Sequence, residues 1–351
     1  MKNNVKNISW HNLYIELSDK CNLSCSYCYN DSSKQKSQML STETVIQLID
    51  QAKSLGVSRI DLSGGEPLLY PNIKKLINHI EQNGMSVNII TNATYFEKWL
   101  VTETKSTFQI TLDGKDLETH SKTRSIENYY DVIKALNIIH DYNVGKRVML
   151  RCNLSRYNES QIKEYIQFAL TYGVNGITFG ALLPMGRCEN IYSDISIYRD
   201  YNSSLRLFNQ LECLAKEFEG KIKIIYPEPK HSYGCPLYSD EIELNAKIDS
   251  EGYIFACSLF SNKELALGNI EKNKLNDNVT YENLYNLISG AKSKKENDKH
   301  CQKCLCGDTC AGGCMASFMQ EDKKHFETCI YLKHNYKDFI KQNIDNFKIV
   351  L

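Results

Sequence analysis

Three cysteines near the N-terminus are spaced to hold a metal centre. Cys21, Cys25 and Cys28 lie in a polar segment that follows the apolar run Leu13–Leu17. Three thiolates so close together can each bind one iron of a [4Fe–4S] cluster. The next cysteine along the chain is Cys152, so this loop leaves the fourth iron open to an outside ligand. An amino acid that offers an amine and a carboxylate can chelate such an iron.

A structural zinc site with a remote fourth ligand is the alternative interpretation of these cysteines. Zinc sites are commonly built from paired Cys-x2-Cys knuckles. Here three residues separate Cys21 from Cys25 and two separate Cys25 from Cys28. The spacing therefore favours the iron–sulfur cluster.

A second group of cysteines lies near the C-terminus, and its members are Cys235, Cys257, Cys301, Cys304, Cys310, Cys314 and Cys329. The N-terminus has no apolar signal-peptide core, so we expect a cytoplasmic protein. In a reducing compartment, clustered cysteines bind metal more readily than they form disulfides. Two zinc ribbons are the alternative for this second group.

Composition narrows the partners of the chain. The 351 residues contain 42 Lys plus Arg and 42 Asp plus Glu, so the formal net charge is zero. This balance gives no electrostatic reason to expect nucleic acid as a partner. No apolar stretch reaches the length of about 20 residues that a membrane span needs, so we expect no membrane partner either.

Strand-like and helix-like segments alternate over the first 220 residues. The predicted strands are Leu13–Leu17, Arg59–Leu62, Val87–Thr91, Phe108–Leu112, Arg147–Leu154 and Gly176–Phe179. The predicted helices are Thr42–Leu55, Ile73–Gln82, Tyr129–Tyr142, Ser160–Tyr172 and Tyr201–Phe218. Such alternation requires a parallel sheet. Because a closed eight-stranded barrel typically needs about 250 residues, we predict an α/β fold with a partial (β/α)6 TIM-type barrel.

The pattern changes after Lys221. Short strands are predicted within 222–226 and 242–255, a helical turn at 283–289 and a charged connector at 291–300. This region has little apolar sequence of its own, so we expect metal to hold it together. We therefore predict a barrel domain at 11–220, a small cysteine-rich iron–sulfur domain at 226–334 and a C-terminal helix or tail at 335–351.

The N-terminal motif resembles that of the radical S-adenosylmethionine (SAM) superfamily, in which an aromatic residue, here Tyr27, precedes the third cysteine. Three further segments resemble the same family: the Gly-Gly-Glu-Pro segment at 64–67, the turn at 91–94 and the segment from Thr111 through Asp113 and His120 to Arg124. The resemblance implies a SAM site formed by Tyr27, Gly64, Gly65, Glu66, Thr91, Asn92, Thr111, Asp113 and Arg124. A surface salt bridge is the alternative for His120 and Arg124.

The second group of cysteines resembles the seven-cysteine SPASM extension of many radical SAM enzymes. The resemblance implies two auxiliary [4Fe–4S] clusters. One would be held by Cys301, Cys304, Cys310 and Cys329, and the other by Cys235, Cys257 and Cys314. The second of these clusters would keep an open iron or borrow a ligand from Cys188, Cys213, Cys306 or His231.

Three other cysteines lie in the barrel region. Cys152 falls in an apolar strand and Cys213 in an amphipathic helix, so both are interpreted as core residues. Cys188 follows the sixth predicted strand, and our hypothesis is that it is catalytic, as a hydrogen donor near the substrate, or a cluster ligand. A small buried residue is the alternative for Cys188.

The family resemblance implies reductive cleavage of SAM to a 5′-deoxyadenosyl radical, which takes hydrogen from a substrate. SPASM relatives mostly modify peptides, so we predict maturation of a ribosomally made peptide by a C–S or C–C crosslink or by epimerisation. The barrel begins near Asn12, so leader recognition is expected to use a separate leader-binding protein or another surface of the chain, and a flavodoxin- or ferredoxin-type electron donor is expected. Sulfatase-type maturation is disfavoured because Ser258 stands where those relatives carry an Asp base.

Two other functions remain open at the level of sequence. Oxidation of a small molecule or a tetrapyrrole is the alternative enzyme activity. An iron–sulfur electron carrier is the alternative without catalysis, but a carrier has no use for the predicted SAM-binding segments.

Overall fold

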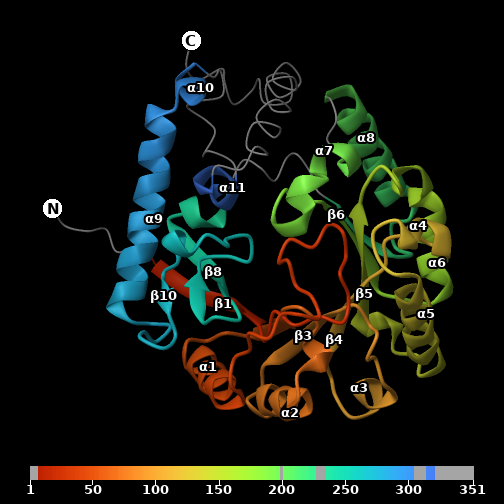
Figure 1. Cartoon of the computed structure of the whole chain (residues 1–351), viewed down its shortest axis with the longest axis horizontal. Coiled ribbons are helices and arrows are strands. Elements are labelled where there is room, and N and C mark those ends of the chain that lie inside the picture. Colours follow the sequence, from red (N-terminus) through yellow and green to blue (C-terminus); the bar gives the residue numbers. More distant parts are fainter. Residues whose placement is uncertain (1–6, 198–200, 227–234, 304–313, 321–351) are drawn as a thin grey trace.

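The computed structural model describes residues 7–197, 201–226, 235–303 and 314–320 (Figure 1). Its strands are β1 (Asn7–Glu16), β2 (Arg59–Ser63), β3 (Ser86–Thr91), β4 (Thr107–Thr111), β5 (Val148–Leu154), β6 (Gly176–Ala181), β7 (Lys223–Ile225), β8 (Glu241–Ile248), β9 (Tyr253–Phe255) and β10 (Gly268–Asn269). Its helices are α1 (Thr42–Ser54), α2 (Ile73–Gln82), α3 (Lys98–Thr102), α4 (Leu117–Ser121), α5 (Ile126–Asp141), α6 (Ile162–Thr171), α7 (Tyr192–Ile195), α8 (Tyr201–Glu217), α9 (Asn278–Asn297), α10 (Lys299–Gln302) and α11 (Met315–Met319).

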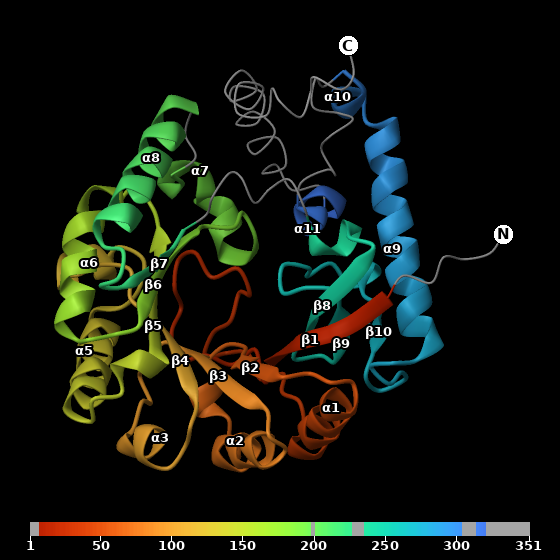
Figure 2. The same cartoon turned by 180° about the vertical axis from the view of Figure 1, so that it is seen from behind.

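Within these residues the strands form a single sheet in the order β10-β9-β8-β1-β2-β3-β4-β5-β6-β7. Every pair from β1 to β7 is parallel. The sheet is curved, and helices α1, α2, α3, α5 and α6 lie along its outer side in both views (Figures 1 and 2). The predicted partial barrel is therefore confirmed, and the short strand predicted within 222–226, β7, joins its sheet as a seventh parallel strand.

Strand β1 is longer than the predicted run at 13–17. It begins at Asn7 because it pairs in parallel with β8 along nearly its whole length, from Asn7 against Glu241 to Ile15 against Ile248. A bulge between Trp10 and Asn12 interrupts the register. The C-terminal region thus continues the barrel sheet rather than standing apart from it, although the predicted domain limits themselves stay a prediction.

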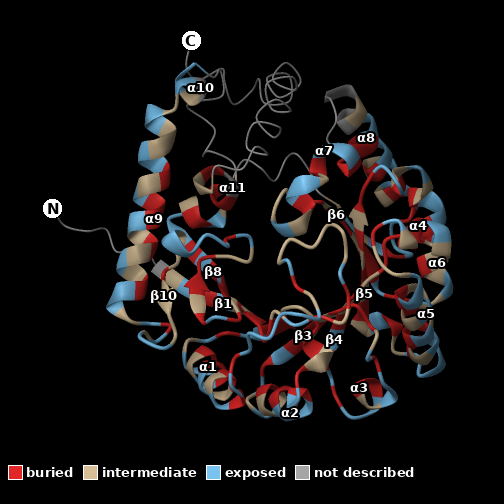
Figure 3. Ribbon diagram, viewed as in Figure 1, coloured by how far each residue is buried: buried red, intermediate tan, exposed pale blue. Residues whose placement is uncertain are grey.

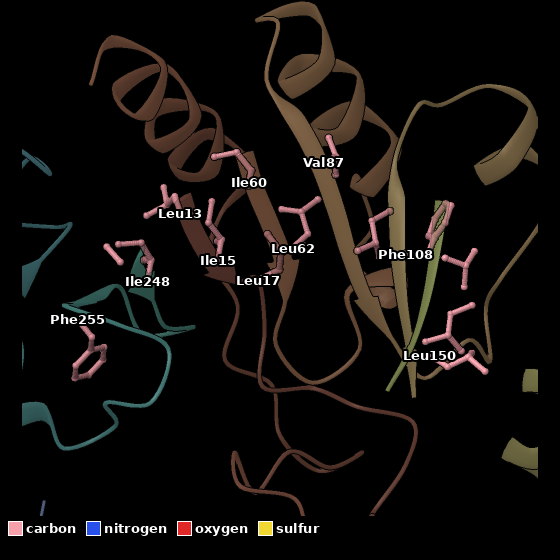
Figure 4. Packing of buried hydrophobic residues seen from close by; sticks show 14 of the residues in the cluster. Leu13, Ile15, Leu17, Ile60, Leu62, Val87, Phe108, Leu150, Ile248 and Phe255 are labelled. Atoms are coloured by element: carbon pink, nitrogen blue, oxygen red, sulfur yellow. The ribbon is translucent and has the colours of Figure 1, made fainter. Parts of the chain in front are cut away.

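Alternate residues of each barrel strand form the core. Leu13, Ile15, Ile60 and Leu62 are completely buried and point towards the covering helices (Figure 4). Buried residues follow the inner faces of these helices, and exposed residues their outer faces (Figure 3). Residues at the intervening strand positions face the concave side of the sheet.

Helix α1 shows how the local sequence fixes the boundaries of an element. The Ser41 hydroxyl accepts a hydrogen bond from the Thr44 amide at 3.0 Å, so Ser41 is the N-cap of the helix. The buried positions Val45, Leu48, Ile49 and Ala52 repeat with helical spacing. The apolar face of the helix therefore packs against the sheet.

The helical turn predicted at 283–289 is part of a longer helix, α9, but the connector predicted at 291–300 was wrong, because α9 continues to Asn297 and α10 begins at Lys299. Leu284, Leu287, Ile288 and Ala291 form one buried stripe beneath the charged side chains of α9. These residues belong to the same hydrophobic core as Leu13 of the barrel. The described part of the C-terminal region therefore contains more apolar packing than we predicted.

None of the described helices combines the length and the apolar character that crossing a lipid bilayer would require.

Candidate active site

The three N-terminal cysteines lie in the long loop after β1, and all three line one cavity of about 450 Å³. Burial raises the pKa of the Cys21 thiol to about 12 and also raises the pKa of Cys25, where the nearby Arg124 guanidinium opposes the effect. The Cys21 sulfur accepts hydrogen bonds from the Leu23 amide at 3.4 Å and from Asn92 Nδ2 at 3.7 Å. These donors favour the thiolate that a metal would bind.

No three His, Cys, Asp or Glu side chains of the described segments converge on a point where a single metal ion would sit. A cubane cluster does not need such convergence, because each cysteine binds a different iron. A cluster instead requires that the three cysteines face a common space, and all three line the same cavity.

The loop after β2 lies directly against the cysteine loop. The Gly65 amide donates to the Ser18 carbonyl at 2.6 Å. A Cβ on Gly64, whose φ is +123°, would overlap the Ser18 carbonyl oxygen, and one on Gly65 would overlap that of Lys20. Both glycines line the cavity, so glycine is required here by backbone contact as well as by the predicted approach of SAM.

Glu66, the third residue of this loop that we predicted to form the SAM site, has a different environment from the two glycines. Glu66 is buried, and its carboxylate accepts hydrogen bonds from the Thr91 hydroxyl at 2.7 Å, the Asn92 amide at 2.8 Å and the Leu68 amide at 3.0 Å. Burial raises its pKa, and these hydrogen bonds oppose the rise. Glu66 thus joins the loops after β2 and β3, while Thr91 and Asn92 line the cavity.

A buried polar network lies beside the third cysteine. The Tyr27 hydroxyl donates to Asp113 and accepts from Arg124 Nη1 at 2.8 Å. The side chains of Arg124 and Asp113 are only 7% and 1% exposed. His120 is completely buried and accepts a hydrogen bond from the Asp113 amide at 3.2 Å. A surface salt bridge is therefore excluded for His120 and Arg124, and Arg124 lines the cavity together with Thr111 and Tyr27.

The loop after β6 holds the cysteine loop from the other side. Arg187 Nε donates to the Cys25 carbonyl at 2.9 Å, Nη2 donates to the Ser32 carbonyl at 2.9 Å, and Nη1 pairs with Asp31 at 2.8 Å. The Arg187 amide also donates to the Cys28 carbonyl at 3.0 Å. Sequence reasoning did not identify Arg187 as a site residue, although it lines the cavity.

Cys188, the next residue, is completely buried. It packs with Leu182, Tyr192 and Ile195 in a small apolar cluster, against which Tyr27 also packs. The cavity wall includes the neighbouring Arg187 but not Cys188. This position fits the alternative of a small buried residue, and a catalytic role for Cys188 stays a prediction.

The structure brings together three cysteines of the second group. The charge of Cys314 acts on both Cys235 and Cys257 and raises their pKa values, as does burial, which is the larger cause. The Cys235 sulfur also accepts hydrogen bonds from the backbone amides of Leu237 and Met315. Cys301 lies on α10, whereas Cys304, Cys306, Cys310, Cys329 and His231 lie outside the described residues.

The other two barrel cysteines differ from each other. Cys152 is buried, as predicted. Cys213 is exposed on α8, so its interpretation as a core residue was wrong. The apolar face of α8 is formed instead by Leu207, Leu211 and Leu214, between which Cys213 falls on the outer side.

Sequence reasoning missed a row of polar residues on the concave side of the barrel, namely Arg59, Asp61, Asn88, Gln109, Arg151 and Asn153, all of which line the cavity. The signal was present, because these polar residues alternate with apolar ones along β2 to β5. The C-terminal region adds Lys247, Ser258, Leu259 and Ser261 to the same wall.

Residues 15–169 match the family model described as the radical SAM superfamily. These residues form a radical SAM domain. The matched segment contains the three loop cysteines and the Tyr27, Asp113 and Arg124 network described above.

Similarity to curated proteins extends beyond the matched domain. The antilisterial bacteriocin subtilosin biosynthesis protein AlbA of Bacillus subtilis is 24% identical over 343 residues, covering 94% of this chain and 73% of that protein. The mycofactocin maturase MftC of Mycobacterium tuberculosis is 24% identical over 312 residues, covering 86% of this chain and 77% of MftC.

Solved structures share the fold. Streptococcus suis SuiB bound to S-adenosylmethionine is 19% identical with a TM-score of 0.68, covering 90% of this chain and 76% of SuiB. Native anSMEcpe with bound AdoMet and Cp18Cys peptide is 18% identical with a TM-score of 0.67, covering 98% of each chain.

A radical SAM domain implies a [4Fe–4S] cluster and SAM, and the residues of this site fit both groups. Three thiols and the buried cation of Arg124 face one cavity, whose volume lies within the range of about 300 to 1,000 Å³ that is typical of ligand sites. A carboxylate can pair with the Arg124 guanidinium, and the thiols can bind iron.

Proposed function

We propose that this radical SAM enzyme matures a ribosomally synthesised peptide. When bound, the cluster and SAM supply a 5′-deoxyadenosyl radical, which takes a hydrogen atom from the substrate. One observation carries the proposal: a single cavity is lined by the three loop thiols, by Arg124 and by side chains from the C-terminal region. Such a cavity can hold the cofactor and a substrate side by side.

The residues of the chain would bind and orient the cofactor. Arg124 and the Thr111 hydroxyl would hold the carboxylate and ribose of SAM, and the Gly64–Gly65 turn would receive its amino group. Tyr27 and Asp113 fix the Arg124 guanidinium through hydrogen bonds and an ion pair at 3.9 Å. Because these groups are buried, they would keep their geometry when the cofactor enters.

The peptide substrate is supported by the relatives. AlbA takes part in subtilosin biosynthesis, and a further relative of Bacillus subtilis is the sporulation killing factor maturation protein SkfB. SuiB has been solved bound to its precursor peptide SuiA. We propose the same substrate class for this chain, with a C–S crosslink, a C–C crosslink or an epimerised residue as the product.

The C-terminal region would carry the electron released from the substrate. We propose that Cys235, Cys257 and Cys314 hold one auxiliary [4Fe–4S] cluster, and that Cys301, Cys304, Cys310 and Cys329 hold another. The electrostatic coupling of Cys314 to Cys235 and Cys257 supports the first set. A flavodoxin- or ferredoxin-type protein would supply electrons, and a separate protein would bind the leader of the substrate.

The proposed chemistry is tested by anaerobic reconstitution with iron, sulfide and dithionite. We expect the enzyme to convert SAM to 5′-deoxyadenosine and methionine, and the Cys21→Ala, Cys25→Ala, Cys28→Ala triple variant to form neither. A triple variant with an undiminished yield would refute the assignment of the cluster. Mass spectrometry of short peptides encoded near the gene, expressed together with the enzyme, then tests the substrate class.

A further inference from the structure

A buried lysine of the C-terminal region reaches the active-site cavity. Lys247 lies on β8, lines the cavity and is only 2% exposed. Its Nζ lies 3.8 Å from Glu16 Oε1 and 4.9 Å from the centre of the Phe255 ring. The distance to Glu16 is too long for a hydrogen bond. An ammonium has three N–H donors, and in the described part of the chain none of them has a hydrogen-bond acceptor.

The carboxylate nearest the Lys247 ammonium belongs to a buried network. Glu16 is 1% exposed and accepts a hydrogen bond from the Tyr29 hydroxyl at 3.3 Å. The Tyr29 hydroxyl in turn contacts that of Tyr14 at 3.3 Å, and Tyr14 donates to Ser63 at 2.6 Å. This chain of contacts joins Lys247 to the residue that follows Cys28 and to the end of β2.

The surroundings of Lys247 define what it can bind. Two carboxylates already act on it, those of Glu16 and Asp249. A further carboxylate would be repelled by this pair, whereas a neutral oxygen can accept a hydrogen bond from the ammonium without that penalty. Ser258 and Ser261 lie in the same cavity wall and offer hydroxyl groups to the same ligand.

We propose that Lys247 is a substrate-binding residue that donates a hydrogen bond to a backbone carbonyl oxygen of the peptide. This inference rests on the proposed function and adds to it a group that anchors the peptide. Because β8 pairs with β1, Lys247 lies beside Tyr14 in the register of the sheet. Lys247 therefore belongs to the C-terminal region but lines the cavity of the barrel.

Variants of Lys247 can be chosen from its contacts with Glu16 and Phe255. Lys247→Met keeps the aliphatic stem against Phe255 and removes the donors, while Lys247→Arg keeps them. The double variant Glu16→Gln, Lys247→Met removes the nearest buried carboxylate together with the ammonium, so a loss of activity there does not arise from a Glu16 carboxylate left without its cation. Lys263→Met is the matched control, because Lys263 pairs with Glu251 at 2.6 Å and lies 5.2 Å from a tyrosine ring but is half exposed.

The assay uses the reconstituted enzyme with two pools of short synthetic peptides, N-acetylated and C-terminally amidated, one without Asp or Glu and one with a single acidic residue in each peptide. The measured quantity is the ratio of 5′-deoxyadenosine formed with a pool to that formed without it. We expect this ratio to fall at least about tenfold in Lys247→Met and in the double variant. Lys247→Arg should recover most of it, and Lys263→Met should match the native enzyme.

The possible outcomes distinguish a failure of the Lys247 inference from a failure of the proposed function. Equal ratios in the native enzyme and Lys247→Met overturn the inference while the proposed function stands. A response to the acidic pool alone overturns the choice of a neutral carbonyl ligand. A native enzyme that forms 5′-deoxyadenosine but neither responds to nor modifies any peptide overturns the proposed function, and this inference with it.

Discussion

Arg187 offers the sharpest test of how the cluster loop is held. Its guanidinium bonds the carbonyls of Cys25 and Ser32 and pairs with Asp31, so Arg187→Met removes three contacts from one loop. Each carbonyl bond contributes about 1 kcal/mol net, and the ion pair, whose Asp31 side chain is 51% exposed, contributes roughly 0.2–1 kcal/mol. Arg187→Met therefore destabilises the ordered loop by about 2–3 kcal/mol. This lowers the equilibrium ratio of ordered to disordered loop roughly 30- to 150-fold.

The assay for this loop is the rate at which the reconstituted cluster gives up iron to a chelator. We expect release from Arg187→Met to be on the order of tenfold to a hundredfold faster than from the native enzyme, since a cluster held by a less ordered loop dissociates more often. Arg187→Lys should be intermediate because it retains one donor group. Adding SAM should change the electron paramagnetic resonance signal of the cluster. We expect this change to be smaller in Arg187→Met than in the native enzyme.

Arg156 provides the matched control. Its guanidinium also holds backbone carbonyls, those of Ser193 at 3.0 Å and Ser196 at 3.4 Å, but none in the cysteine loop. Arg156→Met should therefore release iron at the native rate. Equal rates for Arg187→Met and the native enzyme, with both proteins folded to the same melting temperature, would refute the reasoning.

Three further changes probe the site. Gly64→Ala introduces a Cβ that overlaps the Ser18 carbonyl, so we expect no 5′-deoxyadenosine, whereas Gly56→Ala, at a φ of +81° but with nothing within 4 Å, should retain the native yield. Tyr27→Phe removes the hydroxyl that fixes Arg124; we expect the KM for SAM to rise about tenfold at unchanged iron content, and an unchanged KM would contradict this. Burial lowers the pKa of His120 to about 4, so the neutral ring stabilises the fold above pH 6.5 and this contribution is lost as the pH falls towards 4. Urea unfolding should show about 1.5–2 kcal/mol less stability at pH 5 than at pH 6.5, and His120→Gln should lose that part of the dependence.

Much of the barrel could be predicted from the sequence. The alternation of apolar runs and amphipathic segments predicted β2 to β6, α1, α2, α6 and α8 to within a few residues. These elements can be recognised locally, because apolar residues repeat with different periods in a strand and in a helix with one apolar face. The spacing of Cys21, Cys25 and Cys28 likewise predicted residues that share one cavity.

The C-terminal helix was harder to predict from its own residues. The Lys-rich segment after Ala291 indicates a connector when it is taken alone. Its helical form depends on the packing of Leu284, Leu287, Ile288 and Ala291 against the core. Tertiary contacts stabilise a helix that its charged face does not identify.

Residue types and motif spacing identified the groups that could do the chemistry: the three thiols, the glycines at 64 and 65, Asp113 and Arg124. Their environment follows from the fold, which buries the Arg124 cation, places Cys188 beneath the cavity wall and brings Lys247 to the barrel from a strand more than 200 residues away in the chain. The physical reason is that motif spacing is local, whereas burial and charge pairing depend on which strands lie side by side.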